Sequence, residues 1–199
     1  MNPSLPIKIA ILASGGASNA LKLQEYFQEN PEIEVGLLLS NNPQSGVFAQ
    51  GPKFKVPVIY LPPKAYQDGV YLNQLLATHG IDLVVLAGYL KHIPDELVKQ
   101  YADRILNIHP SLLPRHGGKG MYGMNVHHAV IEAGDAHSGI TIHLVNEHYD
   151  EGKVIFQKRL AVAPHWSAGQ LQQEVLKLEH TYYPEVVANY CQQIANSES

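Results

Sequence analysis

Two polar side chains near the middle of the chain have the types and the spacing that acyl transfer requires. Asn107 and His109 lie two residues apart in the segment RILNIHP, whose apolar residues predict a strand over 104–109 that ends before Pro110. Alternate residues of a strand point to the same side, so both side chains face one site. An amide donor beside an imidazole can stabilise an oxyanion and transfer a proton at one carbonyl group. A capped strand end with a hydrogen-bonded histidine is the structural alternative, and the residue types leave both open.

The segment SGGASN, residues 14–19, is a second candidate site. It joins an apolar run at 7–13 to helical spacing that begins at Ala20, and its small side chains allow an anion to approach the backbone N–H groups. It matches neither the dinucleotide fingerprint nor the P-loop motif. Ser18 and Asn19 add polar donors, so the segment is either a phosphate site or a plain turn in which Ser18 caps the helix.

Strand-length apolar runs alternate with helical spacing along the chain. This order predicts an α/β fold, with a doubly wound, mostly parallel sheet in a single domain over residues 1–199. Such sheets bind ligands at the carboxyl ends of their strands, where both candidate segments fall. The expected strands cover 7–13, 34–40, 56–61, 82–87, 104–109, 138–145 and 154–160. The expected helices cover 20–28, 70–79, a short segment opened by Pro94, 126–133, and 167–194 with an interruption near Pro184.

Composition narrows the class of protein. The formal net charge is -4, from 14 basic and 18 acidic side chains, which argues against binding to nucleic acid or to an anionic membrane. No run approaches the roughly 20 apolar residues of a membrane helix, and no signal peptide is recognisable. The single cysteine, Cys191, fits a reducing compartment. We therefore expect a soluble, cytoplasmic protein with small-molecule substrates.

Eleven histidines raise the question of a metal site. Adjacent His127 and His128 form no HExxH motif or facial triad with a neighbouring carboxylate, so we expect surface histidines and no metal. The glycine-rich segment 114–123, which contains Lys119, lacks the register of a P-loop. We expect it to be a mobile lid over the substrates.

The segment NIHPSLLP, residues 107–114, resembles the signature of the folate-dependent formyltransferases. The resemblance continues in DLVVLAGYL (82–90), SGITIHLVNEHYDEGKVI (138–155) and LEHTYYP (178–184), together with the SGGASN turn. These motifs cover nearly the whole chain in the family's order. The resemblance implies the Rossmann-like formyltransferase fold.

The resemblance also implies a reaction. It implies the transfer of a formyl group from 10-formyltetrahydrofolate to the amine of glycinamide ribonucleotide, in purine biosynthesis, without a metal. Asn107, His109 and Asp150 match the family's catalytic residues. In the expected mechanism the neutral amine attacks the formyl carbon, while Asn107 and a protonated His109 donate to the developing oxyanion. Asp150 favours the imidazolium and accepts the amine's proton through a water.

The binding residues implied by the resemblance fall into two groups. Ala17, Ser18 and Asn19 match the loop that holds the substrate phosphate, and Glu179 matches a carboxylate near the ribose. The expected folate-binding residues are Leu86, Tyr89, Leu90, Lys91, His92, Ile93, Asn107, His143 and Asp150. The phosphate site thus falls mainly in the half 1–100, and catalysis and folate binding in the half 101–199.

Three positions differ from the family pattern or stay ambiguous. Lys91 and His92 stand where the family has an arginine or an apolar residue, and the glycine-rich segment 114–123 is longer than usual. His143 is either a supporting residue of the site or a buried structural histidine.

Several other functions remain as alternatives. A related formyltransferase could act on initiator methionyl-tRNA or a nucleotide sugar, but the negative charge and the lack of a basic C-terminal domain oppose the tRNA substrate. A formyltetrahydrofolate hydrolase would share the Asn–His–Asp set, with an extra N-terminal domain expected. A folate- or nucleotide-binding protein without activity would not need all three residues. A monomer and a homodimer are both compatible with the sequence.

Overall fold

The computed structural model describes residues 5–67 and 69–197 of the 199-residue chain. Its strands are β1 (Ile7–Leu12), β2 (Ile33–Ser40), β3 (Val58–Tyr60), β4 (Leu83–Leu86), β5 (Ile105–His109), β6 (His137–Leu144) and β7 (Val154–Ala161). Its α-helices are α1 (Ser18–Phe27), α2 (Gly46–Ala49), α3 (Val70–Thr78), α4 (Asp95–Gln100), α5 (Met124–Glu132) and α6 (Ala168–Ser197). Short 3₁₀ turns lie at Gly51–Lys53 and Pro63–Tyr66.

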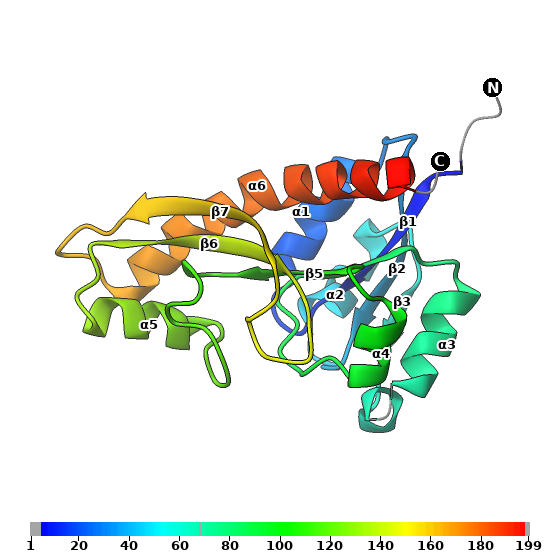
Figure 1. Cartoon of the computed structure of the whole chain (residues 1–199), viewed down its shortest axis with the longest axis horizontal. Helices are drawn as coiled ribbons and strands as arrows, with labels where there is room; N and C mark the ends of the chain where they lie inside the picture. The colour runs from blue at the N-terminus through cyan, green and yellow to red at the C-terminus, as the bar shows by residue number, and fades with distance from the viewer. Residues whose placement is uncertain (1–4, 68, 198–199) are drawn as a thin grey trace.

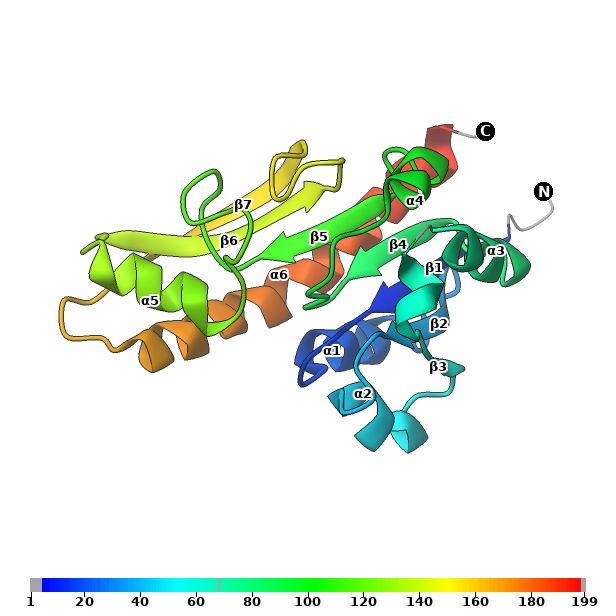
Figure 2. The same cartoon turned by 90° about the horizontal axis from the view of Figure 1, so that it is seen from below.

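All seven strands belong to one sheet, in the order β3-β2-β1-β4-β5-β6-β7. The strands from β3 to β5 pair in parallel, whereas β5–β6 and β6–β7 are antiparallel. Figure 2 shows the strands following one another from β7 to β3. The doubly wound, mostly parallel sheet expected from the sequence is therefore confirmed.

Helices cover both faces of the sheet (Figure 1). One apolar cluster packs β1, β4 and β5 against α1 and α6, and includes Leu23, Leu171 and Val187. A second cluster on the opposite face packs the same strands against α3 and α4, and includes Leu72 and Leu97. The central strands are buried on both sides, which explains their nearly continuous apolar sequences.

The long C-terminal helix corrects one expectation. α6 runs through Pro184 from Ala168 to Ser197, without the interruption expected near that proline. A proline inside a helix costs about 3 kcal/mol, but Pro184 is buried, and the neighbouring Val187 packs in the core. The fully buried Tyr183 also donates its hydroxyl to the Leu86 carbonyl oxygen of β4, at 2.9 Å. These contacts offset the cost.

The order of the strands determines where ligands can bind. The chain moves outward from β1 to β2 and β3, then returns to the other side of β1 with β4 and β5. The loops after β1 and β4 therefore diverge at the carboxyl ends of these neighbouring strands. Open α/β sheets form their ligand crevice at such a switch point.

Candidate active site

A cavity of about 750 Å³ opens at the switch point. Its walls come from the turn after β1, the segment after β4, the end of β5, the glycine-rich loop, the turn between β6 and β7, and one face of α6. Cavities of 300–1,000 Å³ are typical of small-molecule sites. The two candidate segments, far apart in the sequence, thus line one cavity.

Asn107 and His143 face each other across the β5–β6 pair. His143 Nδ1 lies 2.8 Å from the Leu144 carbonyl oxygen, so this nitrogen carries the proton. Its Nε2 then accepts a hydrogen bond from Asn107 Nδ2, at 3.0 Å. His143 is buried, and it holds the amide of Asn107 in place. It is therefore both the supporting residue and the buried histidine that the sequence left as alternatives.

His109 lies at the end of β5 with both ring nitrogens engaged. Nε2 donates to the carbonyl oxygen of His116, at 2.8 Å, and Nδ1 lies 3.5 Å from Asp150 Oδ1. Burial lowers the pKa of His109, and although the Asp150 carboxylate and the bond to His116 oppose this effect, the pKa stays below its ordinary value. The neutral imidazole is favoured at pH 7, in place of the imidazolium expected from the sequence.

Asp150 reaches this site from the turn between β6 and β7. Its backbone is left-handed, with φ 59, a conformation that aspartate tolerates better than most residues. Its Oδ2 accepts the N–H of Gly118 at 2.8 Å. Burial raises the pKa of Asp150, but His143, His109 and the Gly118 N–H outweigh it, and the net shift is downward. Asp150 is therefore a carboxylate at neutral pH.

The turn after β1 is held by its carbonyl groups. Gly15 O accepts hydrogen bonds from Gly46 N at 2.9 Å and from Ser45 Oγ at 3.0 Å. Within residues 5–67 and 69–197, the N–H groups of Gly15 and Gly16 have no hydrogen-bond partner. A Cβ atom added at either glycine would meet nothing within 4 Å. The turn thus presents free N–H groups to an open space.

The helix after this turn does not begin with Ser18 as its cap, which was the alternative to a phosphate site. Ala17, with φ 68, is the N-cap, and no side chain caps α1. Ser18 is the first helical residue and lines the cavity, so its interpretation as the cap is wrong. The Ala17 side chain is buried in the core, and only its backbone is suited to contact a ligand.

Asn19 and Glu179 meet at the far wall of the cavity. Asn19 Nδ2 donates to Glu179 Oε2 at 2.6 Å, between residues 160 positions apart. Burial raises the pKa of Glu179 to about 7, although the Asn19 hydrogen bond acts in the opposite direction. Sequence reasoning connected these residues only through the family resemblance, and the structure brings them into contact.

The residues expected to bind folate also line the cavity. The set comprises Leu86, Tyr89, Leu90, Lys91, His92, Ile93, Asn107, His143 and Asp150. His92 Nε2 lies 3.2 Å from the Glu147 carbonyl oxygen, and its ring meets that of Tyr149 edge-on at 4.7 Å between centroids. His92 thus links the segment after β4 to the turn that carries Asp150.

The structure adds site residues that the sequence analysis missed. His127 was expected at the surface, but it is only 2% exposed, it lines the cavity, and its Nδ1 has no hydrogen-bond partner among the described residues. Burial, followed by the charges of His109 and His128, lowers its pKa to about 4. The loop residues from Gly118 to Gly123 line the cavity as well.

One further group of cavity residues could have been found from the sequence. Gln172, Leu176 and Glu179 all lie on α6 and line the cavity. They are separated by four and three residues, and helix positions at this spacing share one face. The position of Glu179 therefore predicts the other two, once the segment is known to be helical.

Neither a metal site nor a membrane helix is found in the described part of the chain. Within residues 5–67 and 69–197, no three His, Cys, Asp or Glu side chains are grouped so that they could hold a metal ion. None of the helices in these ranges is long and apolar enough to span a membrane.

Comparisons with known proteins agree with this geometry. The sequence model of the formyl transferase family matches residues 7–187. The chain is 42% identical over 192 residues to the chloroplastic phosphoribosylglycinamide formyltransferase of Arabidopsis thaliana, covering 94% of this chain but only 66% of that protein. It is 35% identical over 188 residues to the Bacillus subtilis phosphoribosylglycinamide formyltransferase, covering 90% of this chain and 92% of the relative.

The likeness extends to solved structures. The phosphoribosylglycinamide formyltransferase of Anaplasma phagocytophilum superposes with a TM-score of 0.85 at 29% identity, over 94% of this chain and 87% of that one. Fold and site together define a Rossmann-like α/β protein that has an amide, an imidazole and a carboxylate at its switch point. The chain belongs to the formyl transferase family.

Proposed function

We propose that this protein transfers the formyl group of 10-formyltetrahydrofolate to the amine of glycinamide ribonucleotide, in purine biosynthesis. The observation that carries the proposal is the meeting of Asn107, His109 and Asp150 in one cavity with the turn after β1. The first three suit acyl transfer, and the turn suits a phosphate. Relatives named phosphoribosylglycinamide formyltransferase support this pairing of donor and acceptor.

Asn107 is the proposed oxyanion donor. One N–H of its amide is used by His143, at 3.0 Å, and the other has no hydrogen-bond partner within residues 5–67 and 69–197, so we assign it to the reacting carbonyl group. A donor held in advance costs no reorganisation when charge develops on the formyl oxygen. We therefore assign His143 the role of orienting Asn107.

His109 and Asp150 are the proposed proton-handling pair. The amine attacks the formyl carbon, the bond from that carbon to the folate nitrogen breaks, one proton leaves the amine, and one proton reaches the leaving nitrogen. Neutral His109 is suited to accept the first proton, directly or through a water, and to return it. Asp150, whose lowered pKa keeps it ionised, stabilises the imidazolium that forms. No covalent intermediate with the enzyme is required.

The phosphate and the ribose of the acceptor are assigned to the wall built from β1, α1 and α6. The N–H groups after β1 and the start of α1 suit a phosphate, with Ser18 and Asn19 as added donors. Glu179, which is bonded to Asn19, is the proposed partner of the ribose hydroxyls. This assignment leaves the apolar wall of Leu86, Leu90 and Ile93 for the folate ring.

The proposed functional halves follow from these assignments. Residues 1–100 supply most of the phosphate site, and residues 101–199 supply the catalytic side chains. We also propose a cytoplasmic location, because the charge and the single cysteine fit that compartment, although the Arabidopsis relative is chloroplastic. A monomer or a homodimer remains the proposed assembly, and size-exclusion chromatography with light scattering distinguishes them.

The test is a turnover assay with purified protein. Glycinamide ribonucleotide and 10-formyltetrahydrofolate are mixed with the enzyme, and deformylation of the folate is followed spectroscopically beside a control without nucleotide. Nucleotide-dependent turnover is the expected result. Turnover that is the same with and without nucleotide would indicate a hydrolase. Folate binding without turnover in either reaction would indicate a binding protein and overturn the proposal.

A further inference from the structure

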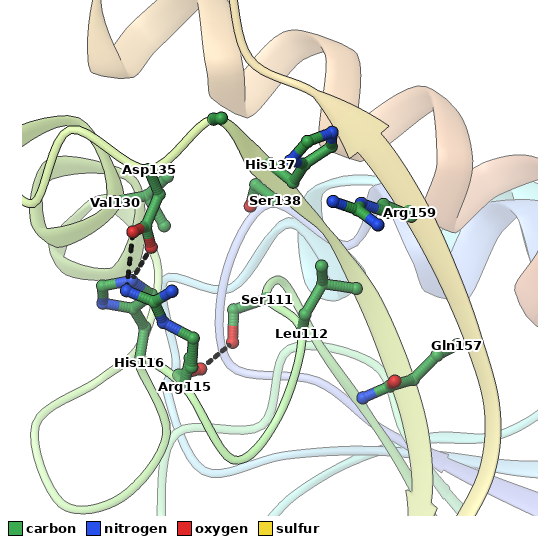
Figure 3. A pocket seen from close by; sticks show the side chains of 11 residues that line it. Ser111, Leu112, Arg115, His116, Val130, Asp135, His137, Ser138, Gln157 and Arg159 are labelled. Atoms are coloured by element: carbon green, nitrogen blue, oxygen red, sulfur yellow. Dashed lines mark hydrogen bonds and ion pairs between the residues drawn. The ribbon is translucent and has the colours of Figure 1, made fainter.

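Two side chains outside the main cavity hold the loop that contacts His109. His116 Nε2 donates to Asp135 Oδ2, at 2.7 Å. Both residues line a second cavity of about 580 Å³, which lies between the loop after β5, the end of α5 and the β6–β7 pair (Figure 3). Neither residue lines the main cavity. The pair can therefore influence the reaction through the loop, without touching a substrate.

The backbone of His116 has a disfavoured conformation. Its φ is 54, in the left-handed region, which is sterically unfavourable for residues that carry a Cβ atom. Such a conformation persists where the surrounding structure holds it, often at a functional site. The hydrogen bond to Asp135 holds the ring of His116. The Ser111 hydroxyl holds the preceding carbonyl group, that of Arg115, at 2.6 Å. The carbonyl group of His116 is thereby directed toward His109 Nε2, at 2.8 Å.

Asp135 is a fixed and ionised anchor for this loop. It lies just after α5, and its N–H donates to the Val130 carbonyl oxygen at 3.2 Å. The hydrogen bond from His116 is the main cause that lowers the pKa of Asp135; burial opposes it, but the Arg115 guanidinium acts in the same direction. The group is therefore a carboxylate at neutral pH. Since a carboxylate can only accept hydrogen bonds, His116 Nε2 carries the proton in this pair.

Two acceptors compete for the ring proton of neutral His109. The His116 carbonyl oxygen lies 2.8 Å from Nε2, and Asp150 Oδ1 lies 3.5 Å from Nδ1. Each acceptor favours the tautomer whose proton faces it, so the hydrogen bond at one nitrogen determines which nitrogen is basic. The shorter contact, to His116, favours the proton on Nε2 and leaves the lone pair on Nδ1.

We propose that His116 and Asp135 are positioning residues that fix the tautomer of His109. Their hydrogen bond holds the loop so that the His116 carbonyl oxygen keeps the proton on Nε2. Nδ1 then stays free to accept a proton beside Asp150, whose carboxylate stabilises the imidazolium. The kinetic part of this inference rests on the proposed function, in which His109 accepts the proton of the amine. The tautomer itself is a property of the protein without substrates.

Arg115 offers a matched control. It donates to the other oxygen of the same carboxylate, Asp135 Oδ1, at 2.6 Å, and Figure 3 shows both partners bound to Asp135. Its side chain is 67% exposed and does not line the main cavity. Arg115→Gln therefore removes one hydrogen bond from Asp135 and leaves the bond from His116 in place.

Nitrogen-15 NMR of the histidine rings tests the proposal without substrates. Spectra are recorded at pH 8, where a histidine with an ordinary or lowered pKa is neutral, and His109→Ala identifies the signals of His109. The wild type and Arg115→Gln should show a protonated Nε2 and an unprotonated Nδ1. In His116→Ala and Asp135→Ala the ratio of the tautomers should shift about 10-fold toward a protonated Nδ1, the equivalent of one hydrogen bond.

Three results of the NMR experiment would overturn the proposal. The first is a wild-type His109 with its proton on Nδ1. The second is an unchanged tautomer in both His116→Ala and Asp135→Ala. The third is the same shift in Arg115→Gln, which would assign the effect to the charge around Asp135 in general.

Steady-state kinetics provide a second measurement. His116→Ala and Asp135→Ala should each lower kcat about 10-fold, with KM for both substrates unchanged, because neither residue lines the main cavity. The double variant should lose no more than either single variant, since both substitutions break the same pair. Arg115→Gln should match the wild type. Additive losses, or a rise in KM with kcat unchanged, would overturn the proposal.

Asp135→Asn is the conservative variant that separates this role from a loss of folding. Its amide oxygen can still accept the hydrogen bond from His116, so it should retain most of the kcat that Asp135→Ala loses. The Tm of each variant checks that the fold is intact. A loss in Asp135→Asn equal to that in Asp135→Ala would contradict the role of the hydrogen bond. Since NMR detects the tautomer without turnover, failure of this inference and failure of the proposed function give different results.

Discussion

One wall of the main cavity presents backbone groups to its ligand, and the other wall presents side chains. On the parallel side of the sheet, the turn after β1 presents backbone N–H groups, and Gly15 and Gly16 leave the space in front of them open. On the antiparallel side, His143 holds the amide of Asn107. Asp150, which accepts the N–H of Gly118, lies beside His109. The backbone wall suits binding of an anion, whereas the side-chain wall suits the control of protons and charge.

The side-chain wall should therefore determine turnover, and its members should act as a unit. His109→Ala and Asp150→Asn are each expected to lower kcat about 100- to 10,000-fold, the usual contribution of acid–base catalysis. The double variant should lose little more than the worse single variant, because the two residues handle the same proton. Steady-state kinetics measure these effects, with thermal unfolding as the control for folding. Near-wild-type turnover in either single variant would contradict the assignment.

Asn107 tests the oxyanion site separately from proton transfer. Asn107→Ala should lower kcat about 100- to 1,000-fold, the typical cost of losing one oxyanion donor. His143→Ala is the matched test of orientation, and it should reproduce part of that loss, with Asn107 still present. A loss of 10-fold or less in Asn107→Ala would place the oxyanion elsewhere.

The protonation of Glu179 should make the free energy of unfolding depend on pH. Its pKa of about 7 lies above the ordinary 4.5, so its contribution to stability is fully present below pH 4.5 and is lost as the pH rises through 7. In Glu179→Gln this decline should disappear, a difference of roughly 3 kcal/mol in the free energy of unfolding.

Urea unfolding of both proteins at pH 4.5, 6 and 8 measures the Glu179 effect. Other titrating groups cancel in the difference between variant and wild type. Parallel pH profiles for the two proteins would show that Glu179 does not retain its proton in the fold.

Gly16→Ala tests the backbone wall and has the smallest expected effect. Its Cβ atom would meet no protein atom within 4 Å, so folding should be unchanged. The methyl group would instead occupy space in front of the N–H groups, and KM for the nucleotide should rise about 10-fold, equivalent to one lost hydrogen bond. The value of kcat should change little.

Gly152→Ala is the matched control for Gly16→Ala. Its Cβ atom would lie 1.8 Å from the Leu144 carbonyl oxygen, so this variant should be destabilised. The same substitution thus affects binding at one wall and folding at the other. A change in kcat without a change in KM for Gly16→Ala would contradict the division between the walls.

Much of this architecture could be predicted from the sequence. The apolar runs around β1, β4 and β5 are strands in the structure, because parallel strands buried on both faces need continuous apolar residues. Asn107 and His109 share one strand end, so their common location follows from the two-residue period. The turn after β1 was also predictable, because it directly follows its strand in the sequence.

Other features depend on long-range packing. The approach of Asp150 to His109 requires the β5–β6 pairing and the turn before β7, and the Asn19–Glu179 bond joins residues 160 positions apart. The sequence connected these pairs only through a family resemblance. The burial of His127 and the passage of α6 through Pro184 were likewise outside the reach of local patterns.

The sequence by itself determined the alternation of strands and helices and the residue types at the strand ends. Local propensity and hydrophobic periodicity act over a few residues, and those features lie within that range. Tertiary structure decided which side chains meet, which histidine carries which proton, and where a second cavity forms. These depend on burial and on contacts between distant segments, because only the packed sheet and its helices exclude water and set the local charges.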